Sequence, residues 1–566
     1  MSELPRAAFR DVAEEAGLRF HHDNGMTGER LMVEMVGPGS ALLDYDRDGD
    51  LDLFLVQGCR LGADSPPDPV RGPWHRLFRN DLTKDSTGKP IVRFTDVSDE
   101  AGLKYCDYGM GVVAGDYDRD GWTDLYLTCF GANRLLRNTG HGGFEDQTAA
   151  AIVAGDGGWS SSGAWVDVDR DGWLDLFVCR YLEWDYTKHK RCSSPGGKAD
   201  YCGPRSFEPA RSRLYRNLGN GTFEDVSRAS RVSSQAGAAL GVVCADVTQD
   251  GWPDLFVAND GMVNHLWINQ RDGTFREEAT PRGCAINSEG MTEANMGVIA
   301  ADFHNRGRMD LFITHLKNEH ATFYENQGEG LFADMTMSLG LDAPTRPFTG
   351  FGTGALDYDN DGWLDIFAAN GEVRINDAQW QAGVKLPMRQ RSLLFHSRGG
   401  LPLRFEEIRE GAFLKVEEVG RGAALGDIDN DGDTDIVVSN AAGPVRLLLN
   451  DVGQDQHWLG LRLLEGSPEA RIEAYGAVCQ VDCGDGRSQW RRCAADGSYL
   501  SSSDPRVLFG LGTNPEVPRV VVTWPDGVQE EWQNLAVDRY HELVRGTGRP
   551  VSSDGAQAAV SEPVDE

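Results

Sequence analysis

The sequence has little positive charge and no long apolar segment. Its 566 residues include 55 Lys and Arg against 88 Asp and Glu, which gives a net charge of −33 at pH 7. Such acidity disfavours nucleic acid and anionic membranes as partners, because their phosphates repel it. No apolar run reaches the roughly 18–20 residues that a membrane span needs. We therefore expect no nucleic-acid partner and no membrane insertion.

A secretion signal is also missing, because residues 1–18 have no basic segment followed by an apolar one. As it stands the sequence indicates a cytoplasmic protein, and export under a leader outside this sequence is the alternative. Eleven cysteines, an odd number, include no paired C-x-x-C of the zinc-binding kind. Cys192 and Cys202 flank a Gly/Pro loop and either form a disulfide or remain thiols. Neither G-x-S-x-G, H-E-x-x-H nor a phosphate-binding loop is found.

What the sequence has in abundance is a nine-residue aspartate motif, first seen as DYDRDGDLD at residues 44–52. Seven copies are spaced by 51 to 79 residues. Each copy follows a small, Gly-rich apolar run such as GMGVVAG and precedes a short apolar strand such as LDLFLV. Segments such as LFRN and GTFEDVS complete the unit. Alternating apolar residues with Gly, Asn and Asp turns predict an all-β repeat of four strands.

The phase of the repeat indicates a closed ring. A phrase of the form F-x-(D/E)-x ends six units, and a further copy stands at residues 9–18 with no unit before it. The last unit, which ends at residues 445–450, lacks that phrase. We expect the N-terminus to supply the missing outer strand, since closure removes exposed sheet edges. The sequence thus predicts an all-β, seven-bladed β-propeller closed by the N-terminal strand, with a linear solenoid as the alternative.

The crowded carboxylates require a cation, because their mutual repulsion is otherwise uncompensated. In Ca²⁺ loops of the EF-hand kind, side chains at positions 1, 3 and 5 and a backbone carbonyl at position 7 bind the ion, with glycine at position 6. The first copy has aspartate at positions 1, 3, 5, 7 and 9 and Gly49 at position 6. Oxygen ligands without His or Cys favour Ca²⁺. We expect about five or six Ca²⁺ ions per chain, each stabilising a turn between two strands.

Six copies supply the predicted ligands, with the backbone carbonyl as the donor at position 7. The predicted metal-binding residues are Asp44, Asp46, Asp48, Asp50, Asp52, Asp116, Asp118, Asp120, Trp122, Asp124, Asp167, Asp169, Asp171, Trp173, Asp175, Asp246, Thr248, Asp250, Trp252, Asp254, Asp357, Asp359, Asp361, Trp363, Asp365, Asp427, Asp429, Asp431, Asp433 and Asp435. Thr248 replaces a carboxylate in the fourth copy, so weaker binding is expected there. The fifth copy has His304 and Arg306 at positions 3 and 5; we expect no Ca²⁺ there, with Arg306 supplying the positive charge.

The units resemble FG-GAP/VCBS-type repeats, which build integrin-α-like propellers with Ca²⁺ in such loops. After residue 455 the pattern changes, and DGSYLSSSDPRVLFGLG at 496–512 and VVVTWPDGVQEEWQNL at 520–535 resemble the ASPIC/UnbV domain. The combination is similar to the cartilage acidic protein family, whose members are often secreted. This resemblance implies a Ca²⁺-binding propeller over residues 1–455 and a small β-rich domain over 456–546. Residues 547–566 lack apolar content and are expected to form a disordered acidic tail.

Two function classes stay open. The first is a calcium-stabilised binding protein that recognises a protein, glycan or small-molecule ligand through propeller-face loops, which is an analogy at the level of fold. The second is a natural-product biosynthetic enzyme of cyclase, lyase or isomerase type with its site in the propeller channel. Converging polar groups in an aromatic-lined channel would favour the enzyme, whereas a flat polar face would favour the binder. Weak catalytic candidates, for which a structural role is the simpler interpretation, are His21, His22, Asp23, Asp107, Glu293 and His315.

Overall fold

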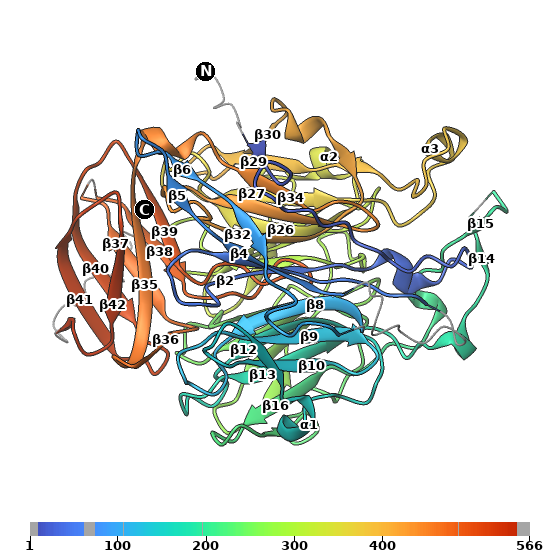
Figure 1. Cartoon of the computed structure of the whole chain (residues 1–566), viewed down its shortest axis with the longest axis horizontal. Helices are drawn as coiled ribbons and strands as arrows, with labels where there is room; N and C mark the ends of the chain where they lie inside the picture. The colour runs from blue at the N-terminus through green and yellow to red at the C-terminus, as the bar shows by residue number, and fades with distance from the viewer. Residues whose placement is uncertain (1–8, 62–73, 106, 195, 485, 552–566) are drawn as a thin grey trace, which may run out of the picture.

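The chain folds into two groups of β-sheets that pack against each other (Figure 1). The computed structural model describes residues 9–61, 74–105, 107–194, 196–484 and 486–551. Within that part of the chain, seven four-stranded sheets lie between residues 10 and 449, and two further sheets lie between residues 457 and 550. No helix among these residues combines the length and the apolar character needed to cross a bilayer.

Each of the seven sheets pairs its strands antiparallel, and in six of them the strands follow chain order. The first three sheets are β2 (Ser40–Leu43), β3 (Asp52–Leu55), β4 (Arg76–Asn80), β7 (Phe94–Asp96); β8 (Tyr108–Gly115), β9 (Asp124–Phe130), β10 (Arg134–Asn138), β11 (Phe144–Asp146); and β12 (Ser160–Val166), β13 (Asp175–Arg180), β16 (Arg213–Asn217), β17 (Phe223–Asp225). The next three are β18 (Ala239–Ala245), β19 (Asp254–Asn259), β20 (His265–Asn269), β21 (Phe275–Glu277); β22 (Val298–Ala301), β23 (Asp310–Ile313), β24 (Thr322–Asn326), β25 (Phe332–Asp334); and β26 (Gly350–Leu356), β27 (Asp365–Asn370), β29 (Leu393–Ser397), β30 (Phe405–Ile408). The last sheet is β32 (Gly420–Gly426), β33 (Asp435–Asn440), β34 (Arg446–Leu449) and β1 (Arg10–Asp11).

The N-terminal strand closes the ring. β1 pairs antiparallel with β34, with Arg10 opposite Leu449. The first strands of the sheets contact one another in the cyclic order β2, β8, β12, β18, β22, β26, β32 and back to β2. These inner strands approach closely: a Cβ on Gly241 would lie 2.4 Å from the Met296 carbonyl oxygen. The predictions of an all-β propeller and of the N-terminal outer strand are confirmed.

The C-terminal group contains two sheets that enclose their own apolar core. Their strands are β35 (His457–Ser467), β36 (Ala470–Glu473), β39 (Val507–Gly512) and β42 (Tyr540–Val544) in one sheet, and β37 (Val478–Asp482), β38 (Ser488–Arg492), β40 (Val517–Thr523), β41 (Gln529–Leu535) and β43 (Arg549–Pro550) in the other. β43 pairs with β41 and so extends this group beyond the expected boundary at residue 546. Residues 552–566 of the expected tail lie outside the described residues.

Residues 498–502, which we call the central segment, leave the C-terminal sheets and enter the middle of the propeller. Ser498 forms a β-bridge with Val298, and Ser502 forms one with Ala41. The amide of Val112 donates to the Leu500 carbonyl oxygen over 3.1 Å. Leu500 is 1% exposed. The sheets of residues 10–449 and those of residues 457–550 are separate, whereas the central segment packs in the core of the propeller.

Short elements occupy the connections. The helices are α1 (Thr148–Ala151), α2 (Asp342–Thr345) and α3 (Asp377–Gln381), with 3₁₀ turns η1 (Met32–Met35), η2 (Tyr186–Lys188), η3 (Pro204–Ser206), η4 (Phe413–Lys415) and η5 (Gly453–Asp455). Small hairpins or pairs are β5 (Thr83–Lys84) with β6 (Pro90–Ile91), β14 (Cys192–Ser193) with β15 (Ala199–Asp200), and β28 (Gln390–Arg391) with β31 (Glu417–Glu418). A disulfide joins Cys192, the first residue of β14, to Cys202. In Figure 1 this hairpin lies at the right, opposite the C-terminal sheets at the left.

Candidate metal centres

Each aspartate motif connects the first and second strands of a sheet and folds into the same tight loop. In the loop between β8 and β9, Asp116 at position 1 accepts the amides of Asp120 at 3.2 Å and Gly121 at 2.8 Å. Asp124 at position 9 accepts the amides of Tyr117 at 3.1 Å and Asn138 at 2.7 Å. The φ of Gly121 is +90°, which explains the glycine at position 6. Backbone amides therefore fix the first and last carboxylates of the loop.

Carboxylate oxygens without a hydrogen-bond partner mark the place for an ion. At position 3, one buried oxygen (Oδ1) has no partner in four loops, in Asp46, Asp118, Asp359 and Asp429. Ligand oxygens of Asp116, Asp118 and Asp124 lie within 4.8 Å of one another, as do those of the matching residues in the third loop. Leaving buried carboxylate oxygens unpaired is costly. Several hard oxygens around one point form the donor set of Ca²⁺, so the residues present fit this ion.

Burial and mutual repulsion raise the pKa of the loop carboxyls. The pKa of Asp116 and that of Asp167 rise to about 7, mainly because burial disfavours the charged form and also because neighbouring aspartates repel it. Burial raises the pKa of Asp52 to about 9. The pKa of Asp124 lies well above its usual value for the same reasons. A divalent cation would remove the repulsion and favour the ionised carboxylates.

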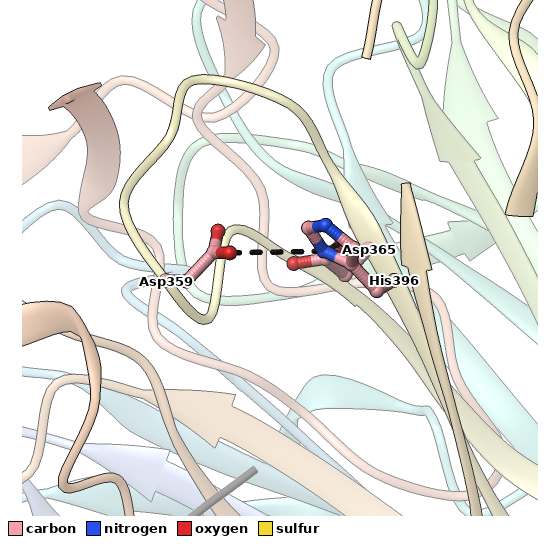
Figure 2. A group of neighbouring side chains, drawn as sticks. All are labelled: Asp359, Asp365 and His396. Carbon is pink, nitrogen blue, oxygen red and sulfur yellow. Dashed lines mark ion pairs between the residues drawn. The ribbon is translucent and has the colours of Figure 1, made fainter. Parts of the chain in front are cut away.

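The sixth loop adds a nitrogen donor that the aspartate pattern does not contain. His396 on β29 faces Asp365, with Nδ1 and Oδ1 3.2 Å apart, and faces Asp359 at 3.7 Å (Figure 2). One ligand atom from each of these three side chains lies within 4.8 Å of the other two. His396 occupies the position before the last residue of β29, whereas the second sheet has Arg137 at that place in β10. The chain therefore varies the residue that faces each loop.

The residue before the last position of the third strand balances the charge of the loop that it faces. In the second loop, Arg137 forms ion pairs with Asp118 and Asp120. In the fifth loop the charges are exchanged: Glu325 on β24 pairs with Arg306 over 2.7 Å. Sequence reasoning missed these partners, although they stand directly before the Asn of LLRN and FYEN. That position is the signal that would have found them.

The fifth loop is closed by a histidine. His304, at position 3, brings its Nδ1 to 2.7 Å from Asp310 Oδ2 at position 9. Its imidazole therefore fills the space in which the other loops have room for an ion. Arg306 was expected to supply the positive charge inside the loop, but its guanidinium turns to Glu325. His304 makes the inner contact with Asp310, and the charge of Arg306 also acts on that carboxylate from the side of Glu325. The absence of Ca²⁺ from this loop stays a prediction.

The fourth loop keeps its carboxylates but fills part of the space with a hydroxyl. Thr248 Oγ1 lies 3.2 Å from Asp254 Oδ2 and 3.4 Å from Asp246 Oδ1. Arg271 forms an ion pair with Asp250 over 2.8 Å. Weaker Ca²⁺ binding at this loop stays a prediction.

The loops are linked to one another around the ring. The residue at position 4 has a positive φ in every loop and reaches toward the next loop. The linking contacts are hydrogen bonds of Arg119 to Gly172, Gln249 to Gly307, Asn305 to Gly362, Asn360 to Gly432 and Asn430 to Gly49, and stacking of Arg47 on Trp122 and of Arg170 on Trp252. Each loop is therefore supported by its neighbour.

The C-terminal sheets pack on this face of the propeller. Tyr540 donates to Asp427 Oδ2 over 2.9 Å, and Arg506 donates to the Asp427 carbonyl oxygen over 2.8 Å. Arg487 donates to the carbonyl oxygen of Asp361 over 3.3 Å. The predicted metal centres thus lie between the two groups of sheets.

The weak catalytic candidates do not come together. His22 is 1% exposed, its Nδ1 accepts the amide of Ala442, and burial lowers its pKa to about 3. Asp107 forms an ion pair with Arg134 over 2.6 Å. Glu293 accepts the hydroxyl of Thr322 and lies 3.5 Å from His315. The remaining two, His21 and Asp23, bond to nearby backbone groups. Among these six candidates, Glu293 and His315 are the two whose side chains contact each other in the described part of the chain.

Comparison with known proteins gives matches to both parts of the chain. Residues 116–178, 197–257, 246–313 and 302–368 match the FG-GAP-like repeat, and residues 467–550 match ASPIC and UnbV. Cartilage acidic protein 1 of Homo sapiens is 25% identical over 512 residues, which cover 86% of this chain and 69% of that protein. The Mus musculus protein is 26% identical over 504 residues, covering 86% and 70%. A solved structure of the Dos1 propeller is 8% identical with a TM-score of 0.34, covering 73% of this chain and 93% of that one.

Proposed function

This protein is a β-propeller of FG-GAP-like repeats that carries an ASPIC/UnbV domain, and on this premise we propose that it is a Ca²⁺-stabilised binding protein. The observation that carries the proposal is a cavity of about 350 Å³ lined by the connections between sheets. Cavities of this size commonly hold small molecules or the end group of a larger ligand. The ligand is therefore a small molecule, or a short part of a protein or glycan.

Calcium has a structural role in this proposal. The loop carboxylates converge on points between strands, and their position-3 oxygens lack partners. An ion at each point would hold a turn of one sheet and, through the residue at position 4, support the next loop. The ions stabilise the ring and thereby keep the binding face in place. No step of the proposed function takes place at the metal.

The cavity with aromatic and carboxylate lining is the feature expected of the enzymatic alternative, but that alternative has less support because the catalytic candidates do not line it. The catalytic candidates fall into three separate groups: residues 21–23, Asp107, and Glu293 with His315. The central segment fills the middle of the propeller, where the channel site was expected. The described residues give no arrangement of nucleophile, base and oxyanion donors from which a reaction could be derived.

Thermal unfolding with and without Ca²⁺, together with metal analysis of the purified protein, tests the proposal. We expect about five or six Ca²⁺ ions per chain and a large fall in melting temperature after chelation. Mg²⁺ at the same concentration should restore less stability, since it keeps its waters and demands octahedral geometry. A protein that binds no Ca²⁺ and melts unchanged after chelation would refute the structural role.

A further inference from the structure

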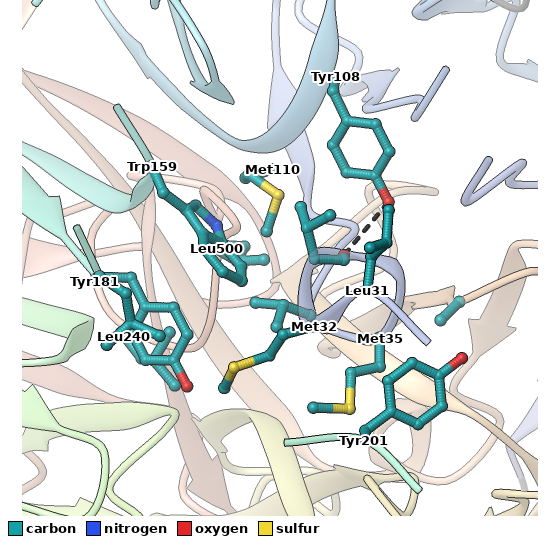
Figure 3. Packing of buried hydrophobic residues seen from close by; sticks show 14 of the residues in the cluster. Leu31, Met32, Met35, Tyr108, Met110, Trp159, Tyr181, Tyr201, Leu240 and Leu500 are labelled. Atoms are coloured by element: carbon teal, nitrogen blue, oxygen red, sulfur yellow. Dashed lines mark hydrogen bonds between the residues drawn. The ribbon is translucent and has the colours of Figure 1, made fainter. Parts of the chain in front are cut away.

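The cavity of about 350 Å³ is closed at its inner end by segments from both ends of the chain. Met32 and Met35 of η1 and Tyr499 of the central segment line it, together with Leu240 and Met296. Figure 3 shows Met32 and Met35 between Tyr181 with Leu240 on one side and Tyr201 on the other, with Leu500 drawn beside Trp159 in the same cluster. Because thioether and aromatic groups form this floor, the cavity suits a compact apolar body.

One wall is fixed by covalent and polar contacts. Residues 201–206 line the cavity, and the disulfide between Cys192 and Cys202 holds the start of that wall. Tyr201 donates to the buried Glu34 carboxylate over 3.1 Å. Arg205 donates to the Gly261 carbonyl oxygen and to Thr292 Oγ1. The wall is therefore formed before a ligand arrives, which reduces the ordering cost of binding.

Two carboxylates face the same space. Asp260 is 7% exposed, and its Oδ2 accepts the hydroxyl of Tyr181 over 2.5 Å. Glu319 lines the cavity and accepts the amides of Ala294 and Leu316 through Oε2. In the described part of the chain, neither carboxylate forms an ion pair with a Lys, Arg or His side chain. A largely buried carboxylate held only by neutral donors is incompletely compensated.

The aromatic side chains add a polarisable surface to a lining that also contains Arg205 and Arg374. Tyr181 and Tyr499 both line the cavity, and aromatic faces attract cations. The face of Phe351 is already occupied by the Arg421 guanidinium at 3.9 Å, and Arg421 is fully buried beneath the cavity floor. Arg421 donates to four backbone carbonyl oxygens, so its donors are engaged. Tyr181 and Tyr499 are almost fully buried and pack edge-on against Trp159 and Phe351, so a ligand would meet only the parts of their rings that border the cavity.

We propose that this cavity binds an organic ammonium ion carried on an apolar or aromatic body, an inference that rests on the proposed binding function and names its ligand class. The ammonium group would lie against Asp260 and Glu319, and the body would rest on the methionines and tyrosines of the floor. A carboxylate in the same place would face Asp260 and Glu319, whose charges have the same sign when they are ionised. Two arginines also line the cavity, and both are exposed residues at its rim. The Arg205 guanidinium is bonded to Gly261 and Thr292, whereas Arg374 is the cation that an ammonium ligand would have to avoid.

The test uses three indole probes of nearly equal size that differ in charge, titrated calorimetrically into the Ca²⁺-loaded full chain. The probes are tryptamine, which is cationic, tryptophol, which is neutral, and indole-3-propionate, which is anionic. We expect tryptamine to bind with a Kd below about 1 mM and tryptophol to bind roughly tenfold more weakly. Indole-3-propionate should show no binding. This comparison on the wild-type chain does not depend on whether any variant folds.

The variant Asp260→Asn should weaken tryptamine binding by roughly tenfold while leaving tryptophol binding unchanged. The matched control is Asp99→Asn, which removes a carboxylate from an exposed pair with Lys104; it should bind tryptamine as the wild type does. Equal affinity for tryptamine and tryptophol, or no binding of any probe to folded protein, would overturn the ligand class. That result leaves the calcium experiment untouched, so the failure of the inference and the failure of the proposed function are distinguished.

Discussion

Asn430 in the seventh loop donates a hydrogen bond to Asp50 Oδ1 in the first loop over 2.8 Å, although 380 positions separate them in the chain. This contact joins the last aspartate motif to the first. Together with the other position-4 contacts, it makes the seven loops a continuous ring on the face that the C-terminal sheets cover. Loss of an ion from one loop should therefore disturb its neighbours as well as its own sheet.

Asp118→Asn tests a single metal centre. In the wild type, Asp118 Oδ1 has no hydrogen-bond partner and is free to bind an ion. The substitution keeps the shape of the side chain but removes its charge, so this oxygen becomes a weaker ligand. We expect the variant to bind one Ca²⁺ fewer per chain and to melt at a lower temperature than the wild type in the same Ca²⁺ concentration. Metal analysis after gel filtration measures the stoichiometry. The exposed Asp99→Asn variant should retain the full number, and an unchanged count in Asp118→Asn would contradict the assignment.

The fifth loop offers the reverse experiment. His304→Asp, Arg306→Asp and Glu325→Arg together recreate the charges of the second loop, where Asp118 and Asp120 face Arg137. Asp302 and Asp310 already hold positions 1 and 9. We expect the triple variant to bind one additional Ca²⁺ per chain. Glu325→Arg alone keeps His304 in the loop and should not gain an ion; if the triple variant gains none either, the loop pattern is not sufficient.

Leu500→Ala tests whether the central segment stabilises the propeller. Leu500 is 1% exposed and packs with the cluster shown in Figure 3. Removing its side chain should lower the free energy of unfolding by about 2–5 kcal/mol, because a cavity would remain among fixed neighbours. Leu401→Ala is the control, since Leu401 is 72% exposed. Equal denaturation midpoints for the two variants would show that the segment only fills space.

His265 should make the protein sensitive to acid. Burial lowers its pKa from 6.5 to about 4, so the unfolded chain binds more protons than the folded chain between these pH values. Stability is therefore retained above pH 6.5 and is lost as pH falls toward 4. We expect His265 to lower the free energy of unfolding by about 2 kcal/mol at pH 5 relative to pH 7.5.

The variant His265→Phe should lose less stability than the wild type when denaturation is compared at pH 7.5 and pH 5.0 in saturating Ca²⁺. Phenylalanine keeps an aromatic ring against Trp267, which His265 contacts edge-on. His141→Gln, at an exposed position, should follow the wild type. Parallel pH profiles for His265→Phe and the wild type would mean that His265 does not titrate in this range.

Thiol counting tests the disulfide. Cys192 and Cys202 are joined by a disulfide. A thiol-reactive chromophore added to denatured protein should therefore report at least two more thiols after reduction than before it, and eleven in all once every cysteine is reduced. A count of eleven before reduction would show that the wall of the cavity lacks this bond in the purified protein.

The repeat could be predicted from the sequence because its determinants are local. Aspartate, glycine and asparagine recur at fixed distances, and the lone F-x-D phrase at residues 9–18 fixes the partner of β34. The partners of the loops were harder to predict. His396 and Glu325 lie on the third strand of their sheets, and only the pairing of that strand brings them to the loop.

The path of the central segment could not be predicted from its composition. DGSYLSSSD reads as a polar turn between strands, yet Ser498, Ser501 and Ser502 are buried. Their hydroxyl or backbone groups bond to inner strands of the propeller, as Ser498 Oγ does to the Ala423 carbonyl oxygen. Serine is small enough for the narrow centre and supplies its own hydrogen bonds there. Such a role depends on a space that exists only after the sheets have assembled.

The pairing of Arg10 with Leu449 sets an order of events on the ribosome. At roughly 5–20 residues per second, synthesis of the intervening chain takes about 20–90 s. Throughout that interval the N-terminal strand has no partner, and the inner strands face a centre that lacks residues 498–502. The nascent chain must therefore carry unsatisfied strand edges for most of its synthesis. Protection by a chaperone, or slow pairing of the early sheets, would decide how much of the newly made protein reaches the closed ring.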